Sequence, residues 1–439
     1  MGIRPCLPQP FCWQRNADSF PPDNRSMHRT FYLLLMVQFI STIADNAFLI
    51  VAIARVIELS SADWVTPLLK IGFTVFYVLL APFVGPLADA IPKGRVMVLA
   101  NALKVGAVML LLGGVDPVLS LLFGGLGAAI YAPAKYGLMT ELLPPKDLVR
   151  ANGFFESTTV CAVIFGTVLG GVLISPVMPH IDLPADYSHF GLAPTALVAG
   201  MLCLVGLNLL ALCLNFGVSD SGKRYPAHSF HPVLVIRRFF LENAVLWRDP
   251  LGGISMSVTT LLWGVGATLQ LIVLRWANEA LDLSLAQGAY LQGVTALGAI
   301  AGAVLASRYV SLHQAIHVLP LGILMGMLFP VMLAVHSVAV AVVLLILLGT
   351  LAGFFIVPMN ALLQHRGCSL LTAGRSIAVQ GFNENAGMLV MLAVYAVATA
   401  AHLSLHTLIW GFGILVTVTM TVLVASRQRL LTAPGANPY

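Results

Sequence analysis

The sequence predicts an all-α membrane protein with twelve transmembrane helices in two halves of six. Three observations support this fold class: the composition, the recurrence of long apolar runs, and the distribution of lysine and arginine. Of the 439 residues, 59% are hydrophobic and only 9% are charged, whereas about 25% of the residues in a soluble domain are charged. Lipid cannot satisfy exposed backbone hydrogen bonds, so these apolar runs are expected to be helices.

Apolar runs of about 20 residues recur along the whole chain, and each is long enough to cross a bilayer as a helix. We expect helices over 31–56, 65–88, 95–113, 117–140, 153–175, 192–216, 253–277, 286–308, 314–335, 337–360, 376–401 and 404–426. The proline-rich start lacks the apolar stretch of a secretory signal. The expected organisation is a disordered tail or over-extended start, a first half, a cytoplasmic linker, a second half and a tail: 1–27, 28–217, 218–252, 253–427 and 428–439.

Lysine and arginine are confined to alternate connections. If the N-terminus is cytoplasmic, the even-numbered loops hold these residues and the odd-numbered loops hold none. The positive-inside rule therefore places both termini in the cytoplasm. The longest polar connection, about 217–252, divides the helices six and six. Its segment FHPVLVIRRFFLENAVLW is either an interfacial amphipathic helix or an ordinary linker helix.

The two halves carry a weak internal echo. RANGFFEST (150–158) opens the expected fifth helix and AVQGFNEN (378–385) opens the eleventh, and both contain Gly-Phe-x-Glu. Pro133 and Pro358 also lie late in the fourth and tenth helices. A repeat at half the chain length is typical of duplicated transporter halves.

The connection after the second helix reads GPLADAIPKGRVMVL (85–99). It resembles the signature between helices two and three of the major facilitator superfamily, with Gly85, Leu87, Asp89 and Arg95 at matching positions. Proline at 92 and alanine at 90 replace the usual glycine and arginine. The alternative is a plain tight turn, but the six-plus-six topology and the charge bias favour the superfamily fold.

Further strings resemble the bacterial lysophospholipid transporter subfamily over about 28–427. They are ADNAFL, APFVGPLAD, GRVMVLANALK, YAPAKYGLMTEL, RANGFFES and FFIVPMNALLQHRG. The resemblance implies a bacterial inner-membrane carrier that moves lysophosphatidylethanolamine and lysophosphatidylglycerol from the outer to the inner leaflet. It also implies a functional link to an acyltransferase/acyl-carrier-protein synthetase that restores the diacyl lipid.

Ionisable residues inside spans are the candidate site residues, because burying them unpaired costs several kcal/mol. Asp45 lies on one face of the first helix with Gln38, Ser41 and Thr42. The resemblance implies that helices one and four line the central cavity, so Asp45 and Lys135 could face the same space. We expect Lys135 to bind the phosphate of the headgroup and Asp45 its ammonium or hydroxyls. The alternative is a structural ion pair. The adjacent Asn46 and Tyr136, together with Gln38, complete the candidate set.

A second set of residues is a candidate cytoplasmic gate. Asp89 ends the second helix and Arg375 starts the eleventh, so Asp89 could cap that helix and pair with Arg375 in the closed state. Arg95 belongs to the same signature. Glu156 and Glu384 are expected to open helices five and eleven, where capping is the simpler explanation, worth about 0.3–1 kcal/mol.

The sequence argues against an enzyme. It contains no HxxxxD acyltransferase pair and no GxSxG, GKS/T or HExxH motif. The six cysteines form no CxxC or metal spacing, so no metal or cofactor is expected. No basic run lies beside an aromatic platform, so nucleic-acid binding has no support. Two alternatives stay open: a proton-coupled drug or solute exporter of the same superfamily, and a non-transporting accessory subunit of a lipid-remodelling enzyme.

Overall fold

The computed structural model describes residues 24–59, 65–179, 197–219, 221–223, 225 and 231–432. Most of the predicted N-terminal tail and the end of the C-terminal tail lie outside these ranges. All regular secondary structure within them is helical. The helices of the N-terminal part are α1 (Asn24–Glu58), α2 (Val65–Leu79), α3 (Ala81–Ala90), α4 (Lys93–Leu112), α5 (Pro117–Leu142), η1 (Pro145–Asp147), α6 (Leu148–Leu173) and α7 (Val198–Asn215).

The remaining helices follow the central linker, which itself contains α8 (Pro232–Arg248). They are α9 (Pro250–Leu281), α10 (Leu285–Tyr309), η3 (Leu312–Val318), α11 (Leu319–Leu328), η4 (Pro330–Ala334), α12 (Val338–Leu370), α13 (Ala373–Ala400) and α14 (Leu405–Thr432). In the described chain, 11 helices are long and apolar enough to span a membrane, or up to 12 if the bent pair α2 and α3 forms one span. The predicted all-α membrane fold is confirmed.

The second predicted helix is broken in the structure. Its two parts, Phe73–Leu79 and Ala81–Ala90, meet at an angle of 76°. Pro82 lies in the first turn of α3, where it has no N–H to donate to the preceding turn and its ring crowds that turn. The break re-aims α3, which ends at the signature residue Asp89 and its neighbour Ala90.

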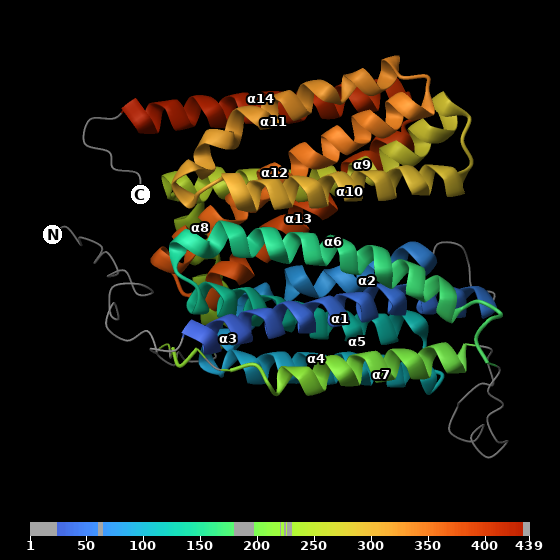
Figure 1. Ribbon diagram of the computed structural model, residues 1–439, viewed down its shortest axis with the longest axis vertical. Helices are drawn as coiled ribbons and strands as arrows, with labels where there is room; N and C mark the ends of the chain where they lie inside the picture. The colour runs from blue at the N-terminus through green and yellow to red at the C-terminus, as the bar shows by residue number, and fades with distance from the viewer. Residues whose placement is uncertain are drawn as a thin grey trace. The chain divides into compact units, whose positions relative to one another are not determined.

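The described chain packs as two compact units. Unit 1 comprises 1–142, 161–240 and 368–381, and unit 2 comprises 143–160, 241–367 and 382–439. Within unit 1, α4 packs against α5 and α7, and α2 packs against α5 (Figure 1). Within unit 2, α9 packs against α10 and α14, and α11 packs against α14. The start of α6 thus belongs to the unit built mainly from the second half, and the start of α13 to the unit built mainly from the first.

Candidate functional site

The Asp45 carboxylate forms a buried ion pair in unit 1. Its Oδ2 lies 2.6 Å from Nζ of Lys104 on α4, and the Lys104 side chain is only 5% exposed. The same ammonium donates to Oγ of Ser41, one turn earlier on α1, at 2.9 Å. An unpaired charge in an apolar helix would be costly, and this pair removes most of that cost. Lys104 is therefore the ion-pair partner of Asp45, whereas the ion pair considered as an alternative from the sequence was with Lys135.

Two further polar groups lie beside this ion pair. Ser41 donates to Oδ1 of Asn101 at 3.2 Å, and Asn101 and Lys104 share one face of α4 at helical spacing. The Asn101 Nδ2 and the Tyr131 hydroxyl are buried and make no hydrogen bond within the described chain. Native interiors satisfy nearly all such groups. These two atoms therefore offer hydrogen-bonding capacity to a polar ligand at this site.

Lys135 on α5 lies beside two tyrosine rings, one of which is that of Tyr131. Its Nζ is 4.2 Å from the ring centroid of Tyr136 and 5.7 Å from that of Tyr131. Lys104 approaches the Tyr131 ring to 5.1 Å. Contacts of this kind hold a cation over the negative face of a ring. The Tyr131 ring thus brings both ammonium groups into one region.

The other two predicted headgroup residues lie on α1. Gln38 is fully buried. Asn46 is half-buried and its amide donates to the backbone oxygen of Thr42 at 2.8 Å, so this bond uses part of its hydrogen-bonding capacity within its own helix. With one aspartate and two lysines, the site carries a net positive charge. Such a site favours a ligand with an anionic group, and the Asp45 carboxylate allows the same ligand to carry a small cationic group as well.

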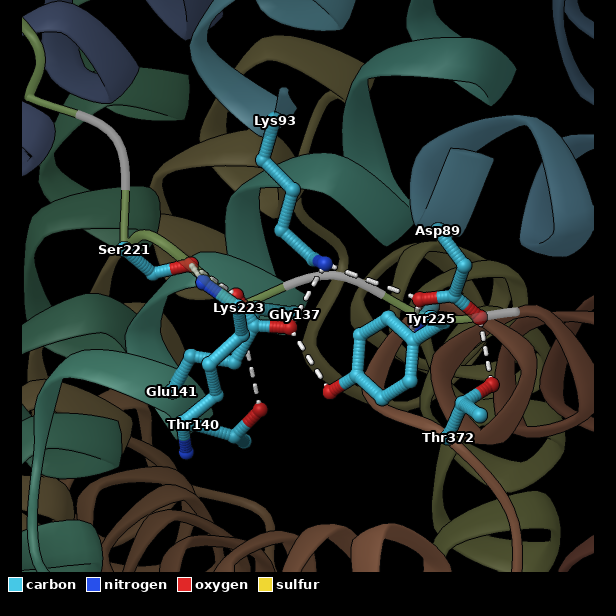
Figure 2. Close-up of polar contacts among 10 residues, drawn as sticks. Asp89, Lys93, Gly137, Thr140, Glu141, Ser221, Lys223, Tyr225 and Thr372 are labelled. Carbon is cyan, nitrogen blue, oxygen red and sulfur yellow. Dashed lines mark hydrogen bonds and ion pairs between the residues drawn. The ribbon is translucent and has the colours of Figure 1, made fainter. Parts of the chain in front are cut away.

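A second polar cluster surrounds Asp89 (Figure 2). Oδ1 of Asp89 accepts a hydrogen bond at 2.9 Å from the backbone N–H of Gly374 in the first turn of α13, and Oδ2 accepts one from the hydroxyl of Thr372. The N-terminal N–H groups of a helix lack partners within the helix and attract negative charge. The Asp89 carboxylate therefore caps α13 inside unit 1.

Lys93 links Asp89 to Glu141 at the end of α5. Its Nζ lies 2.6 Å from Oε1 of Glu141 and 3.5 Å from Oδ1 of Asp89, and all three side chains are at most 5% exposed. Glu141 also accepts from Ser221 at 2.5 Å and from the Tyr225 hydroxyl at 2.9 Å. Figure 2 shows these contacts converging on one carboxylate. The central linker is thus bonded to the cluster that caps α13.

Burial sets the protonation of the linker groups in this cluster. Burial, reinforced by the carboxylates of Glu141 and Asp89, raises the pKa of the Tyr225 phenol, so the hydroxyl stays a donor. The same oxygen accepts from the backbone N–H of Ala373, the first residue of α13. Burial also lowers the pKa of the Lys223 ammonium, against the opposing effect of Glu141.

Two glycines allow the close approach of α3 and α13. A Cβ on Gly85 would lie 2.9 Å from the Cα of Arg375, and a Cβ on Gly374 would lie 2.7 Å from Oδ1 of Asp89. Arg375 is buried at this contact, whereas Arg95 is exposed. Glycine is therefore required on both sides of the cap.

Glu156 and Glu384 do not open their helices. Since α6 begins at Leu148 and α13 at Ala373, both carboxylates lie at least two turns inside, beyond the reach of helix capping. The capping explanation is wrong for both. In unit 2, Oε1 of Glu156 accepts from Asn360 at 3.1 Å. One turn away, Asn152 and Gln364 exchange hydrogen bonds of 2.8 and 3.1 Å.

Comparison with known proteins agrees with this architecture. Residues 31–390 match the model of the family described as Major Facilitator Superfamily. The chain is 38% identical over 384 residues to the "Lysophospholipid transporter LplT" of Pectobacterium carotovorum subsp. carotovorum (strain PC1), covering 87% of this chain and 89% of that protein. The chain belongs to the lysophospholipid transporter family of the Major Facilitator Superfamily.

Other relatives and solved structures extend this assignment. The same name belongs to a relative from Salmonella arizonae (strain ATCC BAA-731 / CDC346-86 / RSK2980), 37% identical over 397 residues and covering 90% of this chain and 95% of that one. The E. coli fucose:proton symporter FucP (N162A) superposes with a TM-score of 0.68 at 14% identity, covering 92% of this chain and 99% of that one. The human organic anion transporter MFSD10 gives 0.67 at 16% identity, with 91% and 100% covered. These two likenesses show the fold alone, and the transporter family confirms that the chain is not an enzyme.

Two residues at the centre of these clusters have no role in the prediction from the sequence. Lys104 carried no assigned role, although its spacing from Asn101 already put two polar groups on one face of an apolar helix. Glu141 was not considered, since it follows the predicted end of the fourth helix at residue 140. Its burial depends on linker residues distant in sequence, and no local pattern signals that contact.

Proposed function

We propose that this chain transports lysophospholipid across the cytoplasmic membrane by alternating access. The observation that carries the proposal is the near full-length similarity to relatives named lysophospholipid transporter, at 35–38% identity. The cationic site in unit 1 supports it, because a lysophospholipid presents one phosphate and one small polar group. The direction is from the outer to the inner leaflet, as the sequence resemblance implies.

In the proposed site the phosphate binds near Lys135 and the Tyr131 hydroxyl. The ammonium of lysophosphatidylethanolamine, or the glycerol hydroxyls of lysophosphatidylglycerol, then bind Asp45 and the Asn101 amide. The Asp45 side chain is 19% exposed even though its carboxylate is paired with Lys104. A headgroup amine can therefore approach it without first breaking a fully enclosed ion pair. Gln38, Asn46 and Tyr136 remain neighbouring candidates for headgroup contacts.

The proposed gate is the Asp89 cap on α13. Release of Gly374 and Thr372 from Asp89 would free the start of α13 and allow one side of the carrier to open. Arg375, packed against Gly85, would move with α13, and the exposed Arg95 would support the signature turn. Glu156 and Glu384 are proposed to belong to the same opening movement in unit 2.

The proposed setting is a bacterial inner membrane with both termini in the cytoplasm, as the lysine and arginine distribution favours. Delivery to the inner leaflet would supply a reacylating enzyme. We therefore propose a functional link to an acyltransferase/acyl-carrier-protein synthetase. Co-expression of that enzyme class should convert the transported lysolipid to diacyl lipid, and the conversion should be lost when the carrier is absent.

Uptake of labelled lysophosphatidylethanolamine into proteoliposomes tests the function. We expect uptake by the wild-type chain and a strong loss in K135A, measured beside a folding control by size-exclusion chromatography. R308Q, a change at an exposed arginine on α10, is the matched control and should transport normally. No uptake by folded wild-type protein would refute transport and favour the accessory-subunit alternative. Loss of uptake on collapse of a proton gradient would favour the proton-coupled alternative.

A further inference from the structure

Helix α8 of the central linker presents a large apolar face that the described chain does not cover. Its buried side carries Phe239 and Leu246, at 3% and 0% exposure. The opposite side is exposed by 45% to 66% at five large apolar residues: Val233, Leu234, Phe240, Leu241 and Val245. Helix α8 is not among the candidate membrane spans, and a surface outside the hydrocarbon region rarely leaves such a contiguous apolar face open to water. The face therefore indicates a partner.

Arginines are interleaved with this apolar face. Arg237 and Arg238 are exposed and lie one turn from the exposed residues Val233, Leu234 and Leu241. Arg248 is also exposed at the end of the helix. With three arginines and one glutamate, α8 carries a net positive charge. A helix that mixes bulky apolar residues with arginines on its outward side is typical of one that lies in a membrane–water interface.

Hydrogen bonds fix which side of α8 faces outward. The indole N–H of Trp247 donates to Oδ1 of Asn383 at 3.0 Å, and Nδ2 of Asn383 donates to Oδ1 of Asn243 at 2.9 Å. Helix α9, which follows α8, is held in place at its N-cap residue Asp249. Arg366 donates to both carboxylate oxygens of Asp249, at 2.6 and 3.1 Å. The protein itself therefore holds α8 with its apolar and cationic side directed outward.

We propose that α8 lies in the cytoplasmic interface of the membrane and binds anionic phospholipid. Phe240 and Leu241 would enter the acyl boundary, and Arg237 and Arg238 would bind lipid phosphates. Charge complementarity selects this partner, because the inner leaflet is anionic and attracts basic segments beside spanning helices. This surface is separate from the Asp45 and Lys104 site, so the proposal does not depend on the transported substrate.

Lipid retention by the full chain tests the proposal. The protein is reconstituted in nanodiscs of phosphatidylcholine with phosphatidylglycerol, extracted, and examined by native mass spectrometry. R237Q/R238Q should bind phosphatidylglycerol roughly 5- to 30-fold more weakly, since each arginine at an anionic surface contributes about 1 kcal/mol. R237K/R238K keeps the charge and should retain the lipid. R150Q/R308Q removes two exposed arginines elsewhere and is the matched control.

Three results would overturn the proposal. The first is unchanged phosphatidylglycerol binding in folded R237Q/R238Q, with folding checked by thermal unfolding. The second is an equal loss in R150Q/R308Q, which would show that lipid retention follows total charge rather than α8. The third is a dimer that R237Q/R238Q dissociates while lipid retention stays constant. That result would show that a second copy of the chain covers this face.

Discussion

Replacing Lys104 with methionine isolates the energetic role of the ion pair in unit 1. The change keeps the apolar stem and removes the ammonium that lies 2.6 Å from Asp45. Removing one partner of a buried pair costs about 3–5 kcal/mol, because the other charge stays buried alone. The Asp45 side chain keeps 19% of its surface exposed, so we expect a loss of roughly 2–4 kcal/mol in the free energy of unfolding.

The double variant D45N/K104M separates this cost from lost packing. It removes both charges, so it should be more stable than K104M, with a coupling between the two positions of about 2 kcal/mol. Thermal unfolding of the purified protein in detergent measures the order of stabilities. K135M is the matched control, because the Lys135 ammonium lies over aromatic rings and Asp45 pairs with Lys104. If D45N couples to K135M as strongly as to K104M, or if K104M unfolds like the wild type, the assignment of the pair is refuted.

Two predictions concern the Asp89 cluster. G374A should destabilise the protein by about 0.5–2 kcal/mol, the value of a helix cap, since a Cβ there would lie 2.7 Å from the Asp89 carboxylate. G381A, with no atom within 4 Å of its Cβ, should unfold no earlier than the wild type, and equal melting of the two variants would contradict the capping argument. Y225F removes the hydroxyl that donates to Glu141 and should cost about 0.5–1.5 kcal/mol. Thermal unfolding checks this value, and an unchanged midpoint would show that the bond contributes nothing.

The spanning helices could be predicted from the sequence because each carries its own signal. Length and hydropathy identify a span locally, and alternate loops carry the lysines and arginines. The break at Leu80 was not predicted, although Pro82 and Pro86 lie in the same span. A proline in a membrane helix can be tolerated, kink the helix or end it, and packing decides among these outcomes.

The site was predictable only in part, because packing also decides which side chains meet. Asp45 was identified because a carboxylate in an apolar helix is conspicuous by itself. Its partner was not, since Lys104 and Lys135 are equally conspicuous in the sequence and α1 contacts both of their helices, α4 and α5. Only the three-dimensional arrangement places the Lys104 ammonium 2.6 Å from the Asp45 carboxylate. The inward position of Glu156 was missed because α6 begins at Leu148, before the predicted start at 153. Glu384 already lay inside the helix predicted from 376, so its placement at the helix start did not follow from the predicted bounds.

Each unit contains a short segment from the other half of the sequence, 368–381 in unit 1 and 143–160 in unit 2. The bonds that these segments make bear on the energetics of alternating access. At least five hydrogen bonds in the described chain connect a residue of the first half with one of the second. They involve Asp89 with 372 and 374, Asn152 with 364, and Glu156 with 360. At about 0.5–1.5 kcal/mol each, they stabilise this state by roughly 2.5–7.5 kcal/mol. Bonds of this total strength disfavour any state in which they are broken, and ligand binding can shift such an equilibrium by its differential affinity for the two states. Weakening these bonds one at a time should therefore raise the population of the other state without any change at the Asp45 site.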